Sequence, residues 1–108
     1  MTTSSRPDDG RSVVRVAGDI DIANSVQLRS ILEAAARDGV VVEVDMGEAT
    51  FVDATGLTAL LVGRRAAIGH GGSLVLTHVP PFFQRLLEIA ALETVLTSVS
   101  GSAAGRGS

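Results

Sequence analysis

The sequence predicts one α/β domain with a mixed, largely parallel sheet of about four to five strands and about three to four helices. Along the chain, short runs of β-branched residues alternate with segments whose apolar residues recur at the spacing of a helix. Alternation of this kind favours parallel strands joined by helical crossovers. The length of 108 residues suits a single domain. Because the only aromatic residues are three Phe, the core must be built mainly from aliphatic side chains.

The two ends of the chain differ in composition from the middle. Residues 1–10 are mainly Ser, Thr, Asp, Pro and Gly, and residues 100–108 are Ser, Gly and Ala with one Arg. Such segments carry too little apolar surface to offset the entropy lost when they are ordered. We therefore expect a disordered N-terminal tail over 1–10, a folded domain over 11–99 and a disordered C-terminal tail over 100–108.

The first folded segment, residues 12–17, is rich in valine and is predicted to be a strand. Residues 18–21, Gly-Asp-Ile-Asp, are expected to turn the chain. From Asn24 the pattern becomes that of a helix, in which Asn24 and Gln27 have the spacing of a capping box and Gly39 lies at the C-terminal end. The predicted apolar stripe of this helix consists of Leu28, Ile31, Leu32 and Ala35.

Residues 40–45 form a nearly continuous β-branched run, which is typical of an interior strand. A loop is expected over 46–50, followed by a short apolar segment and a helix that runs to about His70. Asp53 is the predicted N-cap of this helix, because its carboxylate can accept from backbone N–H groups that have no partner within the helix. The predicted buried stripe consists of Leu57, Leu60, Leu61 and Ile68.

Residues 73–79 are predicted to be a further strand. Pro80 and Pro81 begin a third predicted helix, since proline at the first helical positions loses no needed hydrogen bond. A weaker last strand is expected over 94–99, so the predicted order is β-α-β-α-β-α-β. The buried stripe of the third helix is predicted to contain Phe82 or Phe83, Leu86, Leu87 and Ala90.

Charge and residue types exclude several kinds of function. A net charge of −3 with scattered arginines argues against a nucleic-acid partner. The absence of cysteine excludes disulfides, thiolate metal sites and a cysteine nucleophile. The chain has neither the apolar segment of a signal peptide nor one long enough to span a bilayer, so we expect a cytoplasmic protein without membrane insertion.

The candidate site lies where the predicted strands end. In successive right-handed β-α units the carboxyl ends of the strands share one edge of the sheet, so Asp19 and Asp21 should lie near residues 53–58. Thr55 falls in the first turn of the second helix, where free backbone N–H groups and the helix dipole would accommodate a phosphate. A cluster of Asp, Thr and Gly is also typical of a simple helix cap, and these residues alone leave that alternative open.

An enzyme is not expected from this pattern. Asp19, Asp21 and Asp53 could form an acid/base pair or a Mg²⁺ site, but the first two have the character of turn residues and the third that of a cap. The sequence contains no P-loop, dinucleotide-binding, zinc-protease or nucleophile-elbow motif. His70 and His78 have no sequence-near partner of metal-ligand type. We therefore predict no catalytic residue, cofactor or metal site.

The order of motifs resembles the STAS domain of bacterial anti-sigma factor antagonists, the SpoIIAA-like family, over residues 13–99. In the family's Asp-Ser-Ser-Gly-Leu pattern, the hydroxyl residue before glycine is phosphorylated by an anti-sigma factor that is also a protein kinase. Here that residue is Thr55, and Ala54 replaces the preceding serine. The matching segments are Gly-Asp-Ile-Asp at 18–21, the strand at 41–45, Phe-Val-Asp-Ala-Thr-Gly-Leu at 51–57 and Gly-Gly-Ser-Leu-Val-Leu at 71–76.

The resemblance implies a partner switch. The unphosphorylated protein, a monomer, binds an anti-sigma factor of the GHKL protein kinase type and thereby frees a sigma factor. Phosphorylation of Thr55 ends this binding, and a PP2C-type phosphatase resets it. Asp21 corresponds to the family's kinase-binding aspartate, and Gly56 is expected to leave room for the kinase's active site. The implied partner-binding residues are Asp19, Asp21, Asp53, Ala54, Gly56, Leu57 and Thr58.

A second hypothesis keeps the fold and drops the switch. The chain would then be a scaffold subunit, similar to the STAS proteins that attach to an ABC transporter ATPase in lipid transport or to those of stress-sensing complexes. Threonine at position 55, where the family usually has serine, slightly favours this hypothesis. A third hypothesis is a nucleotide-binding module.

Overall fold

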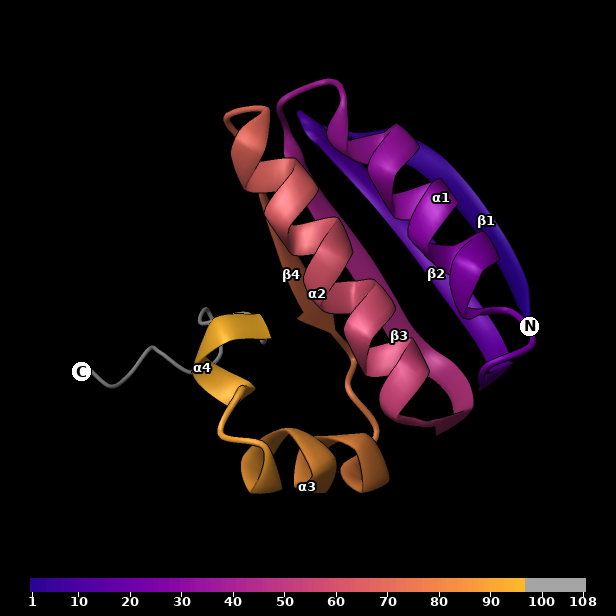
Figure 1. Cartoon of the computed structure of the whole chain (residues 1–108). Coiled ribbons are helices and arrows are strands. Elements are labelled where there is room, and N and C mark those ends of the chain that lie inside the picture. The colour runs from indigo at the N-terminus through magenta and orange to yellow at the C-terminus, as the bar shows by residue number, and fades with distance from the viewer. Residues whose placement is uncertain (97–108) are drawn as a thin grey trace.

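The computed structural model describes residues 1–96 and contains one sheet in the order β1-β2-β3-β4. β1 and β2 are antiparallel, whereas β2, β3 and β4 are parallel to one another (Figure 1). The predicted mixed, largely parallel sheet is confirmed. The elements are β1 (Thr2–Asp8), β2 (Arg11–Ile20), α1 (Ser25–Ala36), β3 (Val41–Val52), α2 (Ala54–Gly69), β4 (Ser73–Thr77), α3 (Pro81–Ile89) and α4 (Glu93–Leu96).

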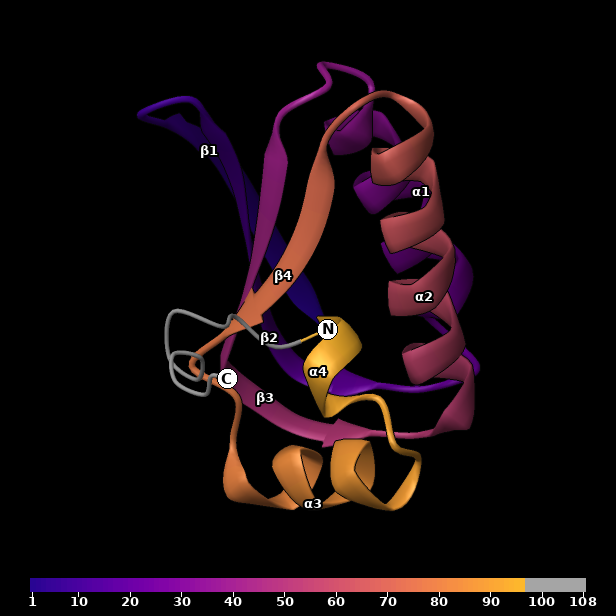
Figure 2. The same ribbon diagram turned by 90° about the vertical axis from the view of Figure 1, so that its left-hand side faces the viewer.

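Helices α1 and α2 lie side by side and cover one face of the sheet, while α3 lies at the end of the molecule toward which β4 points (Figure 2). The two covering helices approach closely because α2 presents Gly63 to Leu32 of α1. A Cβ atom on Gly63 would lie only 2.8 Å from the Cβ of Leu32. The core between sheet and helices is aliphatic apart from Phe83, as predicted, and includes Val14, Val16, Ile20, Leu28, Val42, Val44, Met46, Leu60, Leu74, Leu76 and Leu87.

The expectation of a disordered N-terminal tail is wrong for Thr2–Asp8. This segment pairs with β2 along its whole length, and Asp9 and Gly10, with φ of 53° and 83°, close a two-residue hairpin. Positive φ at both turn residues matches the twist of the flanking strands, and Asp-Gly is a favoured sequence for such a turn. Pairing satisfies the backbone hydrogen bonds of a strand whatever its side chains, so a polar composition alone does not predict disorder.

β2 and β3 are also longer than predicted. The residues expected to form a loop at 46–50 continue β3, and Met46 and Ala49 are buried. β2 runs to Ile20, so the turn begins at Asp21 and not at Gly18. The register between the two strands shifts twice, and each shift leaves an extra residue in β3. Such bulges break the alternation of buried and exposed side chains, which hides the strand from a pattern search.

The two covering helices begin at the predicted residues but differ in detail. Asn24 is the N-cap of α1, yet the predicted capping box is absent: its side chain accepts from Asp21 N (2.9 Å) and donates to Asp19 O (2.9 Å) instead. In α2, the periodicity predicts that Ile68 is buried, but its side chain is 48% exposed. Close contact with α1 and the sheet favours small residues, and four of the five buried positions are small. They are Gly56, Ala59, Gly63 and Ala67, and the fifth is Leu60.

The C-terminal part confirms the third helix and corrects the last strand. α3 buries Leu87 and, of the two phenylalanines offered as alternatives, Phe83, while Phe82 is exposed. Ala90, also assigned to the buried stripe by the periodicity, is exposed. Residues 93–96 form the short helix α4, and Leu96 is fully buried. The prediction of a strand at 94–99 is therefore wrong for 94–96, because apolar residues spaced three and four apart also suit a helix. The remainder of that strand and the predicted C-terminal tail lie outside the described residues. Within residues 1–96, no helix combines the length and apolarity needed to cross a bilayer.

Candidate functional site

Asp53 joins the end of β3 to the start of α2. Its backbone N–H donates to the carbonyl of Ile20 (3.1 Å), which ties the ends of β3 and β2 together. Its Oδ1 accepts from the backbone N–H groups of Thr55 (2.9 Å) and Gly56 (3.0 Å), so the predicted N-cap is confirmed. The pKa of Asp53 is lowered, first by a hydrogen bond from the Thr55 hydroxyl and then by the Gly56 N–H, with smaller contributions from the N–H groups of Thr55 and Ile22; desolvation opposes the shift.

Thr55 is half-buried in the first turn of α2, and its hydroxyl donates to Asp53 Oδ1 at 2.5 Å. The expectation of free backbone donors at this helix start therefore needs correction, because the Asp53 carboxylate already accepts from two of them. A phosphoryl group on Thr55 would lose the hydroxyl's hydrogen bond to Asp53. It would also place a second negative group beside that carboxylate.

Gly56 is buried and faces the interior. A Cβ atom there would lie 2.8 Å from Cγ2 of Ile20, 3.0 Å from Cγ1 of Val52 and 3.1 Å from the carbonyl oxygen of Ile20. Glycine at this position therefore lets the first turn of α2 rest on the ends of β2 and β3. The space next to Gly56, which the resemblance leaves open for a kinase's active site, is occupied on this side by Ile20 and Val52 of the same chain.

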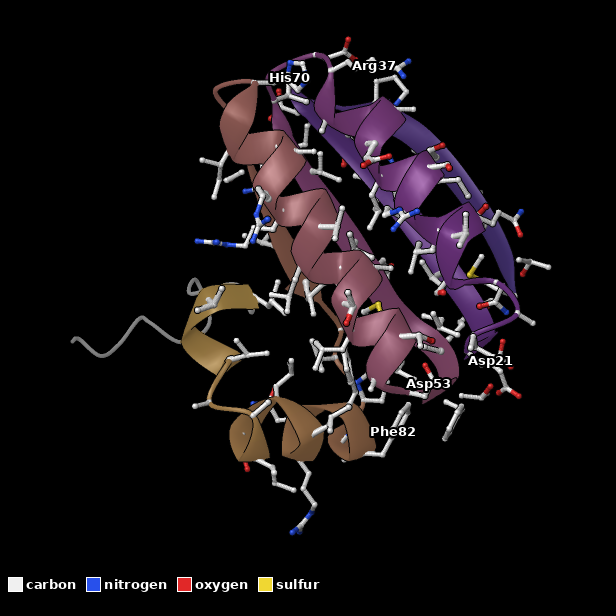
Figure 3. The ribbon with its side chains drawn as sticks, in the orientation of Figure 1. Asp21, Arg37, Asp53, His70 and Phe82 are labelled. Atoms are coloured by element: carbon white, nitrogen blue, oxygen red, sulfur yellow. The ribbon has the colours of Figure 1, made fainter. Side chains whose placement is uncertain are left out.

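Asp19 and Asp21 lie at the same edge as Asp53, as predicted. Asp19 pairs with Phe51 across the two strands, and its carboxylate accepts from the Thr50 hydroxyl (2.6 Å). Asp21 shapes the turn before α1: its carboxylate accepts from Ala23 N (3.0 Å). Figure 3 shows Asp21 and Asp53 at one end of the molecule, with Arg37 and His70 at the other.

The remaining predicted residues of the site differ in how exposed their side chains are. Ala54 and Thr58 are exposed, and the Thr58 hydroxyl donates to the carbonyl of Ala54 (3.0 Å). Leu57 is half-buried and packs against the core. We use the term α2 edge for the surface that consists of Asp19, Asp21, Ile22, Phe51, Asp53, Ala54, Thr55 and Thr58.

Sequence reasoning missed the apolar side chains of this edge. Ile22 is 75% exposed and Phe51 49% exposed. Ile22 directly follows Asp21, and its backbone N–H contributes to lowering the Asp53 pKa. Phe82 (41% exposed) lies at the same end of the molecule (Figure 3). No sequence signal separated these residues from the core, because a large apolar residue next to a strand end is typical of burial.

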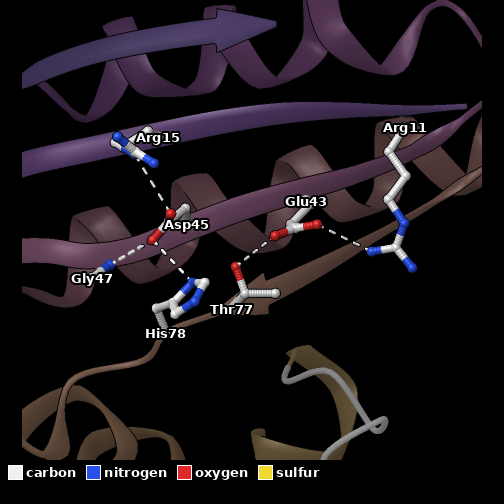
Figure 4. A network of polar contacts seen from close by, with 7 residues as sticks. All are labelled: Arg11, Arg15, Glu43, Asp45, Gly47, Thr77 and His78. Carbon is white, nitrogen blue, oxygen red and sulfur yellow. Dashed lines mark hydrogen bonds and ion pairs between the residues drawn. The ribbon is translucent and has the colours of Figure 1, made fainter. Parts of the chain in front are cut away.

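The face of the sheet that α1 and α2 leave uncovered carries paired charges (Figure 4). Glu43 forms an ion pair with Arg11 (3.1 Å), and Asp45 forms one with Arg15 (3.5 Å) and contacts His78 Nδ1 (3.3 Å). Each carboxylate accepts a further hydrogen bond, one from the Thr77 hydroxyl and one from Gly47 N. We call this surface the outer face. In the part of the chain that the structure describes, no group of three or more His, Cys, Asp or Glu side chains is arranged to hold a metal ion.

The chain belongs to the STAS domain family, since a family model described as "Mlab, STAS domain" matches residues 4–98. Among known proteins it is similar to the anti-sigma-B factor antagonist of Bacillus subtilis (strain 168), with 27% identity over 92 residues that cover 85% of this chain and 84% of the relative. The resemblance inferred from the motifs is confirmed at the level of the family.

Two solved structures share the fold. An anti-sigma factor antagonist from Mycobacterium paratuberculosis has a TM-score of 0.73 at 24% identity, covering 88% of this chain and 81% of that one. The Bacillus cell fate determinant SpoIIAA in its phosphorylated form has a TM-score of 0.70 at 17% identity, covering 89% of each chain. At these identities the likeness concerns the fold.

Proposed function

We propose that the chain is an anti-sigma factor antagonist whose unphosphorylated α2 edge binds an anti-sigma factor and so frees a sigma factor. The observation that carries this proposal is the exposure of Ile22 and Phe51 near the ends of β2 and β3, the strand ends that Asp53 ties to the start of α2. Large apolar side chains exposed together next to polar groups are typical of a protein-docking surface. Similarity to an anti-sigma-B factor antagonist supports the kind of partner.

In this proposal the partner is a GHKL-type protein kinase that phosphorylates Thr55. The γ-phosphorus of ATP forms a bond to Thr55 Oγ1, its bond to the ADP oxygen breaks, and a base of the kinase takes the hydroxyl proton. The new group carries about −1.5 to −2 charges at neutral pH. It would be attached beside the Asp53 carboxylate, so burying it against a partner costs both repulsion and desolvation. A PP2C-type phosphatase hydrolyses the phosphate and restores binding.

The test compares wild type, Thr55→Ala and Thr55→Glu. Thr55→Ala should lose about 1 kcal/mol of stability or less, bind the genomically adjacent anti-sigma candidate and resist phosphorylation. Thr55→Glu should fold and bind with an affinity lower by about 3 kcal/mol, roughly a 100-fold higher Kd. Ser30→Glu adds the same charge at an exposed position of α1 and should bind like wild type. Melting temperatures and calorimetric Kd values of all four proteins check this.

Equal affinities for Thr55→Ala and Thr55→Glu would contradict the switch. They would favour the scaffold hypothesis, in which a pull-down recovers a transporter-type ATPase and no GHKL kinase. If Thr55→Ala destabilises the protein strongly and both variants bind alike, Thr55 is only part of the helix cap. Equilibrium dialysis with ATP and GTP tests the nucleotide-binding hypothesis separately, and we expect no retention of either.

A further inference from the structure

A cavity of about 230 Å³ opens beside Thr55 between the first turns of α1 and α2. The proposed docking of a partner on exposed apolar side chains does not explain the role of this cavity. Its walls combine apolar residues with hydroxyl-bearing residues and Arg29. The lining residues are Ser25, Val26 and Arg29 of α1, and Ala54, Thr55, Thr58 and Ala59 of α2.

Arg29 supplies the one positive charge in this lining, and within residues 1–96 it forms no ion pair. Glu33, one turn further along α1, lies in a position to pair with it but is not within ion-pair distance. This contrasts with the outer face, where Arg11 and Arg15 both pair with carboxylates of β3. The N–H donors of the Arg29 guanidinium are therefore available to form hydrogen bonds with an anion in the cavity.

The start of α2 cannot take that anion without losing its cap. The N–H groups of Thr55 and Gly56 both donate to Asp53, and this carboxylate also repels a phosphate on the neighbouring hydroxyl. A phosphoryl group on Thr55 is therefore driven away from Asp53. The space next to Thr55 on its other side is the cavity that this residue lines. Arg29 is the positively charged residue in the lining of that cavity.

We propose that this cavity receives the phosphoryl group of phosphorylated Thr55 and that Arg29 binds it. The inference rests on the phosphorylation in the proposed function and adds a positioning residue to it. Arginine forms short, charge-assisted and often bidentate hydrogen bonds with phosphate, so it compensates the repulsion from Asp53. The phosphorylated protein then keeps its fold while its phosphate occupies the groove between α1 and α2.

The experiment places phosphothreonine at position 55 during synthesis, in wild type, Arg29→Gln, Arg29→Lys and Arg37→Gln. Arg37→Gln removes the same charge from the opposite end of α1 and serves as the matched control (Figure 3). The melting temperature of each protein is compared with and without the phosphate. Phosphorylation should lower it by about 3–6 °C more in Arg29→Gln than in wild type. Arg29→Lys should be intermediate and Arg37→Gln should match wild type.

Two further readouts separate binding by Arg29 from a general effect of charge. The excess loss in Arg29→Gln should shrink in high salt, since partly exposed charges are screened. The ³¹P resonance of the phosphothreonine should shift on Arg29→Gln and stay in place on Arg37→Gln. An equal loss of melting temperature in all four proteins, with an unchanged ³¹P resonance, would overturn the inference. Such a result leaves the switch intact if Thr55→Glu still weakens partner binding, so the two proposals fail separately.

Discussion

The α2 edge and the outer face use the same residue types in opposite ways. On the outer face the carboxylates of Glu43 and Asp45 are 19% and 15% exposed, and each pairs with an arginine of β2. At the α2 edge, Asp19, Asp21 and Asp53 accept from hydroxyl and backbone N–H groups and form no ion pair within residues 1–96. Two large apolar side chains near these strand ends, Ile22 and Phe51, are exposed.

The difference indicates what each surface contributes. Paired charges on the outer face satisfy one another, so that surface offers few unpaired charges to a partner. The carboxylates of the α2 edge form no ion pair within residues 1–96, and Ile22 and Phe51 are exposed near the same strand ends. A surface of that kind gains free energy when a partner with complementary charge and apolar area docks on it.

The largest effect on stability is expected at Gly56, where the α2 edge rests on the sheet. Gly56→Ala places a Cβ within 3.1 Å of Ile20 and Val52, and overpacking of this kind costs about 1–3 kcal/mol. We expect a melting temperature lower by roughly 5–10 °C, measured by calorimetry. Gly69→Ala is the matched control, because a Cβ there meets nothing within 4 Å. Equal melting temperatures for the two variants would mean that the first turn of α2 is not held against the sheet.

The same substitution in both regions tests the comparison directly. Asp21→Asn keeps an oxygen for the Ala23 N–H, so it should leave stability unchanged while raising the Kd for the anti-sigma factor by about fivefold, or about 1 kcal/mol. Asp45→Asn breaks the ion pair with Arg15 and should lower stability by about 1 kcal/mol or less, with binding unchanged. Calorimetry and chemical denaturation measure the two quantities. The reverse pattern would remove the functional distinction between the surfaces.

The smallest effect concerns the pH dependence of the α2 cap. The pKa of Asp53 is lowered in the folded protein, so its ionised form contributes stability that is present above the unfolded pKa near 4 and is lost as the pH falls through the folded value. Asp53→Asn removes the carboxyl group that titrates. Its melting temperature should lie below that of wild type at pH 7, and the gap should narrow between about pH 5 and pH 3. If the difference in melting temperature between the two proteins stays constant with pH, the charge of Asp53 does not contribute to the cap and only the shape of its side chain does.

Local features of the site were predictable from the sequence. The cap by Asp53 involves only residues 53, 55 and 56, and such short-range hydrogen bonds follow from residue type and order. The meeting of Asp19, Asp21 and Asp53 at one edge followed from the handedness of β-α units. The N-terminal strand does not follow from the polar composition of residues 1–8, although Asp9-Gly10 is a strong hairpin signal.

The sequence by itself therefore determined the strand and helix order over most of the chain, the aliphatic core and the position of the Thr55 hydroxyl in the first turn of a capped helix. Only the tertiary structure decided which apolar residues remain exposed, what Gly56 touches and which cation stands beside Thr55. The physical reason is the separation along the chain of the residues on which each feature depends. Caps and periodicity depend on neighbours within one turn, whereas the exposure of Ile22 and the cavity between Arg29 and Thr55 depend on how α1 and α2 pack together on the sheet.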